Sequence, residues 1–208
     1  RDEFLQSPVR EFPIATNRLP GLDGQVCYQV CPQGYWTDFA VAMAARCMDE
    51  YGVDGVYLDT TVRSMPCSNE THGCGYVRPD GTRAPTYPVF ATRELIKRLC
   101  AVVKARKADG LVDVHPYDCV NIPALAFADG MWIGEHLTGS PHKPDALPLD
   151  RFRAEFMGHN LGIPADLLYY KLREYDPSVA IAMLHDVPVR CEKDADFDTI
   201  AQVYRIRE

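Results

Sequence analysis

The sequence of 208 residues lacks the long apolar run of a membrane protein, and its first residues lack the pattern of a secretory leader. No apolar stretch approaches the roughly 18 residues that a transmembrane helix needs, so we expect no membrane span. The first residues, RDEFLQSPVREF, are polar and charged, unlike a signal peptide. The chain has no initiator methionine and its last residues are typical of an unfinished helix, so we expect both ends to be cut or processed. Localisation is therefore unknown, and would be secreted or periplasmic if a longer chain carries a signal peptide.

Positive charge is also scarce, because 22 Lys and Arg oppose 29 Asp and Glu and the net charge is -7. Binding of a nucleic acid requires a clustered basic face. The densest basic stretch, residues 93–107, has instead the spacing of a solvated helix face. We therefore expect no nucleic-acid partner.

The phosphate-binding motifs G-x-G-x-x-G and G-x-x-x-x-G-K are absent, which disfavours a nucleotide-binding doubly wound sheet. Short apolar runs alternate with longer amphipathic ones, a pattern typical of βαβ units and a parallel sheet. We expect strands at residues 25–30, 53–59, 111–115, 131–135 and 179–185. We expect helices at residues 37–51, from 88 onward, at 123–127 and 151–159, and from 197 onward.

The predicted fold class is α/β, a parallel (β/α) barrel of TIM type. About five strands are visible, whereas a complete barrel of this type has eight in about 250 residues. We therefore interpret residues 1–208 as a single (β/α)-barrel domain of catalytic type, an incomplete C-terminal portion of the barrel within a longer multidomain chain. The runner-up is a doubly wound open sheet.

Ionisable side chains follow the predicted strands at the point where each strand ends. Asp59 ends GVDGVYLD, His115 ends LVDVH, Glu135 ends GMWIGE, and His185 with Asp186 ends VAIAMLHD. In a parallel barrel the carboxyl ends of the strands meet on one face, where barrel enzymes have their active sites. We therefore predict that Asp59, His115, Glu135 and His185 line one cavity.

Two carboxylates at a barrel mouth suit the cleavage of a glycosidic bond, which needs one protonated acid and one ionised carboxylate. We predict Asp59 and Glu135 as the catalytic residues. Glu135 follows the apolar run MWIG, which would desolvate it and raise its pKa for the acid role. Asp59 is followed by Thr60 and Thr61, whose hydroxyls are expected to stabilise its ionised form.

Residues that bind a carbohydrate substrate are predicted around this pair. His115 is expected to hydrogen-bond either carboxylate or a sugar hydroxyl, and Tyr57 and Trp132 to offer aromatic faces to a sugar ring. The long loop of residues 60–87 is expected to fold over the barrel mouth, because such loops in compact domains are usually functional. The predicted binding set is Tyr57, His72, Tyr76, Arg78, His115, Trp132, His185 and Asp186.

Eight cysteines are more than a typical cytosolic domain carries, but too few for a disulfide scaffold. Cys67 and Cys74 flank the loop sequence SNETHG, a spacing that is compatible with a disulfide and with two free thiols. With His72 they suggest a zinc site, but zinc needs a fourth ligand, and none follows at a short spacing. We therefore predict no metal ligands and no cofactor.

Two sets of segments resemble known families. GVDGVYLD resembles the fourth-strand motif of many barrel glycosidases, in which the terminal aspartate is catalytic or binds substrate. The combination of CSNETHGCGYVRPDGTRAPT, FATRELIKRL and IPALAFADGMWIGEH resembles poorly characterised bacterial barrel proteins related to glycoside hydrolase family 123. This resemblance covers roughly residues 53–136 and implies a barrel domain with a carbohydrate-related role.

The sequence departs from family 123 at one important place. Enzymes of that family carry an adjacent Asp-Glu pair, whose Asp orients the acetamido group of the substrate and whose Glu is the acid. Here Thr60 follows Asp59, and the adjacent pair Asp49-Glu50 lies on a predicted helix and is expected to face solvent. Either Glu135 supplies the acid from another strand, or the chain does not catalyse.

Three functions are therefore compared. The first is a glycoside hydrolase that acts on a bacterial, plant or host glycan through Asp59 and Glu135, and the second is a non-catalytic carbohydrate-binding barrel. The third is a metal-dependent hydrolase using Asp59, His115, His185 and Asp186, although the H-x-H of such barrels is absent. Metal content separates the third from the others, and activity on aryl glycosides separates the first two.

Overall fold

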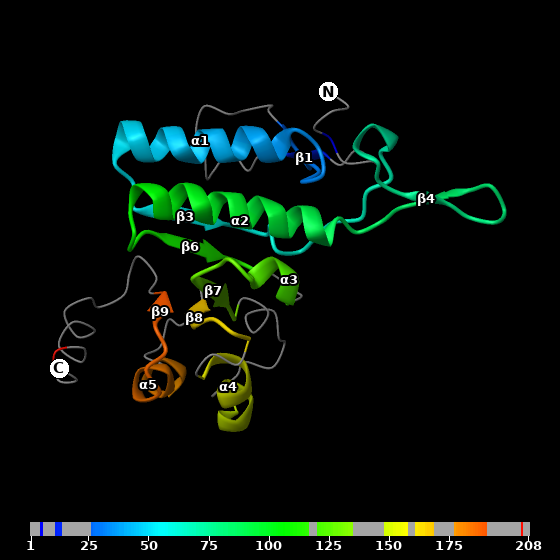
Figure 1. Ribbon diagram of the computed structural model, residues 1–208. Helices are drawn as coiled ribbons and strands as arrows, with labels where there is room; N and C mark the ends of the chain where they lie inside the picture. The colour runs from blue at the N-terminus through cyan, green and yellow to red at the C-terminus, as the bar shows by residue number, and fades with distance from the viewer. Residues whose placement is uncertain are drawn as a thin grey trace. The chain divides into compact units, whose positions relative to one another are not determined.

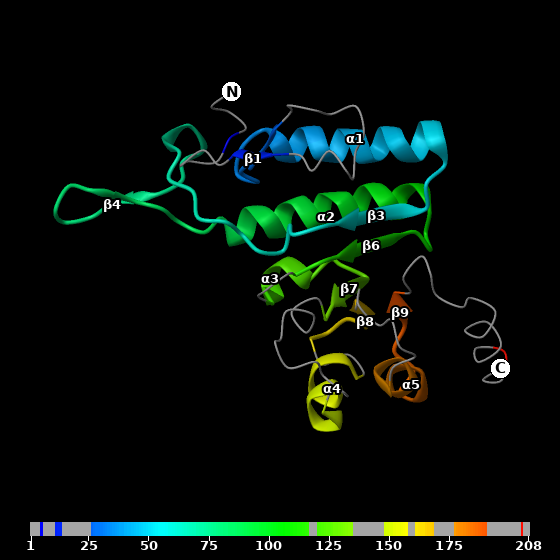
Figure 2. The same cartoon turned by 180° about the vertical axis from the view of Figure 1, so that it is seen from behind.

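The computed structural model describes residues 5, 11–13, 26–116, 120–134, 148–157, 161–168, 177–190 and 205. The chain divides into two compact units, Arg1–Gly130 and Met131–Glu208, which are described separately below. Figures 1 and 2 show the elements of each unit from opposite sides. Whether all residues together form the single barrel domain expected from the sequence stays a prediction.

Two long helices lie side by side in the first unit, α1 (Trp36–Tyr51) and α2 (Val89–Arg106) (Figures 1 and 2). Both were predicted from apolar spacing. Helix α1 ends at Gly52, whose positive φ of 65° allows its N–H to cap the Met48 carbonyl at 3.1 Å. The apolar spacing also predicts a buried stripe of Phe39, Met43, Cys47 and Tyr51 on α1. This is wrong, because Phe39 and Tyr51 are 50% and 74% exposed and the other two are only half-buried.

Helix α2 covers a parallel pair of strands, β3 (Gly55–Leu58) and β6 (Leu111–Val114). Ile96 and Val103 of the helix and Val112 and Val114 of the strand are fully buried, and they form the core of this layer. Strand β3 was predicted from its continuous apolar run, which is typical of strands covered on both faces, and β6 was predicted from the Asp109-Gly110 turn before it. The register pairs Leu58 with Val114, so the two strands end at the same level.

The first unit also contains antiparallel pairs. Strand β1 (Glu11–Pro13) pairs with β2 (Val26–Tyr28), so the strand predicted at residues 25–30 exists but is not part of the parallel sheet in the described residues. The long loop after β3 contains η1 (Glu70–His72) and a hairpin of β4 (Tyr76–Val77) and β5 (Arg83–Ala84). The short helix α3 (Ile122–Leu125) packs on α2.

The second unit contains three parallel strands, β7 (Gly130–Ile133), β8 (Ala165–Leu168) and β9 (Val189–Arg190). Helix α4 (Leu149–Phe156) packs on β8 and buries Phe152 and Phe156. Helix α5 (Pro177–Leu184) precedes β9.

The strand predicted at residues 179–185 is wrong, because this segment belongs to α5. A short apolar run of Val, Ala, Ile, Met and Leu does not distinguish a buried strand from a buried helix by periodicity. Pro177 resolves the ambiguity, because its fixed φ favours the first turn of a helix. His185 and Asp186 therefore follow a helix and do not end a strand.

The fold class is thus α/β, with parallel strand pairs and covering helices in both units. Among the described residues no sheet is seen to close into a barrel, so the TIM-type barrel remains an interpretation of the sequence. None of the helices in the described part of the chain has the length and apolar character needed to cross a membrane.

Candidate functional site

Asp59 and His115 lie side by side at the carboxyl ends of β3 and β6. The backbone N–H of His115 donates to the Leu58 carbonyl at 2.9 Å, which continues the parallel ladder beyond the strands. The Nδ1 atom of His115 lies 3.0 Å from Oδ1 of Asp59. The histidine side chain is 4% exposed, whereas that of Asp59 is 66% exposed. A buried imidazole therefore fixes the position of a carboxylate that faces solvent.

The backbone directly after Asp59 is strained. Thr60 has a φ of 54°, which is a rare conformation for a β-branched residue. Strain of this kind costs of the order of 1–3 kcal/mol and is found mainly where function requires it. The Thr61 hydroxyl donates to the backbone carbonyl of Asp59 at 3.0 Å, rather than to its carboxylate as the sequence suggested. The turn therefore holds the backbone of Asp59, while His115 holds its carboxylate.

Asp59 lines a cavity of about 540 Å³ in the first unit. One part of the lining comes from the chain around β2 and the start of α1, and includes Tyr28 and Trp36. Another part comes from the turn after β3, and includes Thr60 and Arg63. The cavity thus combines a carboxylate, a guanidinium and two aromatic side chains. The remaining lining residues are Gln29, Val30, Cys31, Pro32, Thr61, Ser64, Met65, Thr92 and Leu95.

Of the four side chains predicted to line one cavity, Asp59 lines the cavity described above, and His115 contacts Asp59 without being one of the lining residues. Glu135, the predicted acid, lies outside the described residues. His185 belongs to the second unit, where its backbone N–H bonds the last turn of α5 and its ring packs on Phe152 at a centroid distance of 5.4 Å. Asp186 follows it with a φ of 60°, in a left-handed turn. Both residues therefore terminate a helix.

The long loop of residues 60–87 contributes to the Asp59 cavity through its first residues only. Tyr76 and Arg78 are exposed and belong to the projecting β4–β5 hairpin, and they are not among the residues that line this cavity (Figure 1). His72 is buried among three cysteines, Cys31, Cys67 and Cys74. These cysteines are free thiols, so the disulfide considered between Cys67 and Cys74 is not formed.

The two predicted aromatic contacts lie on different strands. Tyr57 is 41% exposed on β3 and pairs in register with Asp113 of β6. Trp132 is half-buried on β7 in the second unit. A carboxylate that the sequence did not single out, Asp166 of β8, faces Trp132 in register and hydrogen-bonds its side chain. Burial raises the pKa of Asp166, and the hydrogen bond from Trp132 opposes that shift.

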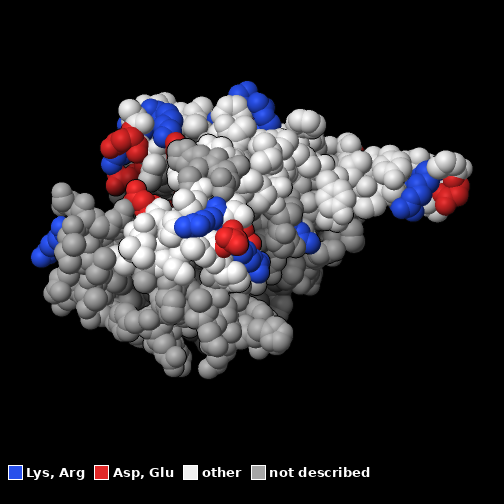
Figure 3. Space-filling view, turned by 90° about the horizontal axis from the view of Figure 1, so that it is seen from below, with Lys and Arg blue, Asp and Glu red and all other residues white. Residues whose placement is uncertain are grey.

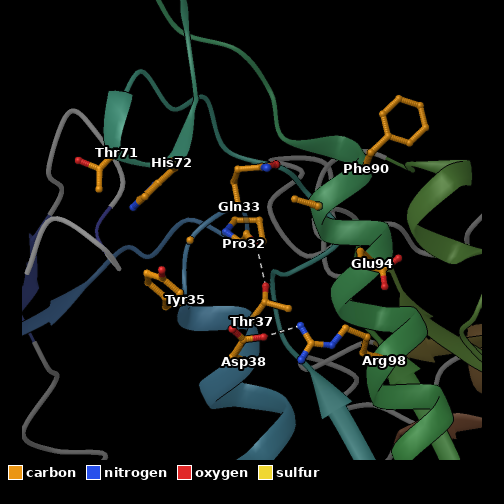
Figure 4. A pocket seen from close by; sticks show the side chains of 12 residues that line it. Pro32, Gln33, Tyr35, Thr37, Asp38, Thr71, His72, Phe90, Glu94 and Arg98 are labelled. Carbon is orange, nitrogen blue, oxygen red and sulfur yellow. Dashed lines mark hydrogen bonds and ion pairs between the residues drawn. The ribbon is translucent and has the colours of Figure 1, made fainter.

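A second cavity of about 600 Å³ lies between the starts of α1 and α2 (Figure 4). An ion pair bridges its two helices, because Arg98 of α2 donates to Asp38 of α1 at 2.7 Å. The Thr37 hydroxyl donates to the Pro32 carbonyl at 2.6 Å and ties the start of α1 to the preceding turn. His72 lies on the wall of this cavity (Figure 4).

Charges on the surface are mixed in sign. On the face shown in Figure 3, basic and acidic residues are interspersed, and the tip of the projecting hairpin carries both. The adjacent pair Asp49-Glu50 faces solvent on α1, as expected. Arg106 holds Asp49 at 2.8 Å and lowers the pKa of its carboxyl group, and Arg46 holds Glu50 at 2.8 Å. The carboxylates of Asp49 and Glu50 are therefore both engaged in surface ion pairs.

No protein family matches the chain, and a search of curated proteins likewise returns no match.

Proposed function

We propose that this chain is a carbohydrate-active protein of glycoside-hydrolase type, in which the cavity at Asp59 receives a sugar ring. The observation that supports this most is the Asp59–His115 pair, in which a buried histidine holds an exposed carboxylate beside a strained turn. Tyr28 and Trp36 offer apolar faces for the C–H surface of a sugar. Asp59 and Arg63 offer hydrogen-bonding groups for its hydroxyls.

In this proposal Asp59 is the ionised carboxylate of the reaction. Its negative charge would stabilise the positive charge that develops at the anomeric carbon in the transition state. The sequence assigns the acid to Glu135, which would protonate the leaving oxygen. The resemblance to proteins related to family 123 agrees with a carbohydrate-related role, and the barrel architecture belongs to this proposal.

His115 acts as a positioning residue. Its Nδ1 bond to Oδ1 leaves the other carboxylate oxygen of Asp59 for the substrate, and its burial prevents the imidazole from turning away. A carboxylate held in this way loses less conformational entropy when a sugar binds.

The two carboxylates are tested by comparing Asp59→Asn and Glu135→Gln on an activated aryl glycoside and on a natural disaccharide. Loss of an acid should cost roughly 10²–10⁴-fold in rate on the disaccharide and much less on the aryl glycoside, whose leaving group needs no protonation. Glu135→Gln should show this difference, whereas Asp59→Asn should slow both substrates severely. Equal slowing of both substrates by Glu135→Gln, with no effect of Asp59→Asn, would show that the roles are wrong.

A non-catalytic carbohydrate-binding domain is the second candidate. It is favoured by one observation, that the residue after Asp59 is the strained Thr60 rather than the glutamate of substrate-assisted enzymes. If sugars bind and Asp59→Ala weakens their binding, while no glycoside of the panel is hydrolysed, this candidate replaces the hydrolase.

A further inference from the structure

Four buried side chains in the first unit converge on one point although they are distant in the sequence. Cys31 follows β2, and Cys67, His72 and Cys74 belong to the loop between β3 and α2. One ligand atom from each lies within 4.8 Å of those of the other three. The exposed fractions of these residues are 1%, 0%, 8% and 3%. Three sulfur atoms and one imidazole nitrogen thus share a small buried space.

The spacing of the sulfur atoms fits a tetrahedral metal ion. The Sγ atoms of Cys31 and Cys74 are 3.7 Å apart, which is far longer than a disulfide bond. Ligands about 2.3 Å from a central zinc ion are separated by about 3.8 Å along a tetrahedral edge. The pair therefore already has the separation that two thiolates take on one zinc ion.

Backbone N–H groups point at two of the sulfur atoms. The N–H of Asn69 donates to the sulfur of Cys67 at 3.5 Å, and the backbone of Gln33 donates to the sulfur of Cys31. In each case the donor is two residues after the cysteine. Hydrogen bonds of this kind stabilise a thiolate more than a thiol, and they are the second layer of contacts expected around metal-bound sulfur.

The histidine and the third cysteine are positioned by neighbouring side chains. The amide nitrogen of Asn69 lies 3.5 Å from Nε2 of His72. Arg83 donates to the carbonyl oxygens of Ser68 and Cys74, which places its positive charge beside the cluster. The same guanidinium is ion-paired with Glu70 at 2.9 Å, so it fixes the backbone around Cys74 rather than supplying a free positive charge.

We propose that Cys31, Cys67, His72 and Cys74 bind one Zn²⁺ ion as a structural site. Three thiolates and one imidazole in tetrahedral arrangement are a structural zinc set, and no position remains open for water or substrate. Zinc is favoured over calcium or magnesium, because those ions require oxygen ligands. This site includes neither of the proposed catalytic carboxylates and does not depend on the proposed glycosidase activity.

The metal would fasten two segments that both line the Asp59 cavity. Cys31 and Pro32 contribute to one part of the lining, and Arg63, Ser64 and Met65, a few residues before Cys67, contribute to another. Sequence reasoning missed this site because it looked for a fourth ligand after Cys74. Cys31 lies 36 positions before Cys67, and only the fold brings it close.

The experiment measures metal in the full chain after expression with zinc and dialysis without chelator. Elemental analysis should find about one zinc per chain. After removal of zinc at low pH and refolding with Co²⁺, thiolate-to-cobalt charge-transfer bands and the intense visible bands of tetrahedral cobalt should appear. Each of Cys31→Ser, Cys67→Ser and Cys74→Ser should lower zinc content several-fold. The matched controls Cys47→Ser and Cys100→Ser, on α1 and α2, should keep full zinc content.

A measurement on the wild-type chain keeps the test independent of the folding of these variants. In the zinc-loaded chain, Cys31, Cys67 and Cys74 should resist alkylation by iodoacetamide, and chelation should expose all three together. Absence of zinc combined with absence of the cobalt bands would overturn the proposal. So would iron in place of zinc, a disulfide within the cluster, or equal loss of zinc in the two control variants.

Discussion

The bond between His115 and Asp59 can be tested by three substitutions that differ in which ring nitrogen they imitate. The amide nitrogen of Asn at position 115 takes the place of Nδ1 and keeps a donor for Asp59. Gln places its amide near the position of Nε2, and Ala has no donor. His115→Asn should therefore preserve the function of the cavity, whereas His115→Gln and His115→Ala should not.

The size of the effect follows from the geometry. A hydrogen bond to a charged group contributes about 1.5–3 kcal/mol, and the Nδ1–Oδ1 distance of 3.0 Å is a normal one. Since the Asp59 side chain is 66% exposed, water competes for the carboxylate and the lower end of that range applies. A loss of about 1.5 kcal/mol corresponds to about a tenfold decrease in kcat/KM.

The assay is kcat and KM for a glycoside that the wild-type chain hydrolyses, with thermal unfolding of each variant measured in parallel. A positioning role predicts that kcat falls about tenfold in the Gln and Ala variants while KM changes little, because the carboxylate acts mainly in the transition state. The Asn variant should recover most of kcat, even if all three variants lose similar stability. If the loss of kcat instead follows the loss of stability, with Asn no better than Gln, the reasoning is refuted.

Two further predictions concern stability. The pKa of Asp166 is raised in the folded chain, so the free energy of unfolding of the chain should fall as pH rises from the usual aspartate pKa through the folded value. The variant Asp166→Asn should remove this pH dependence and stabilise the chain at pH 7. A pH profile of urea unfolding that is unchanged in the variant would contradict this prediction. Gly75→Ala should destabilise more than Gly81→Ala. Both glycines have φ above 80°, and an alanine in this left-handed conformation costs about 1–2 kcal/mol at either position. Only at Gly75 would the added Cβ also contact a carbonyl oxygen, that of Ala84 at 2.8 Å. Equal losses in the free energy of unfolding, measured in urea, would show that the backbone around Ala84 moves away from the added Cβ.

The parts of the fold that could be predicted are those whose signals are local. Gly55–Leu58 is a continuous apolar run, Leu111–Val114 follows the turn residues Asp109-Gly110, and each is followed directly by a polar residue. Both strands and the meeting of Asp59 with His115 therefore follow from parallel pairing. Gly52 likewise identifies the end of α1 from sequence.

The parts that could not be predicted depend on contacts between distant residues. The run that forms α5 is apolar in either conformation, so its packing decides between helix and strand. Strand β8 is only four residues long and contains Asp166, which hides its apolar character. The approach of Cys31 to the loop cysteines has no local signal.

The claim that the Asp59 cavity recognises a sugar is tested most directly by a crystal structure of the chain soaked with the saccharide that binds best in a panel. The account predicts a sugar ring in this cavity, with a hydroxyl within hydrogen-bond distance of the Asp59 carboxylate and with a ring face against Trp36 or Tyr28. A saccharide bound elsewhere on the chain, with this cavity holding only water, would contradict it.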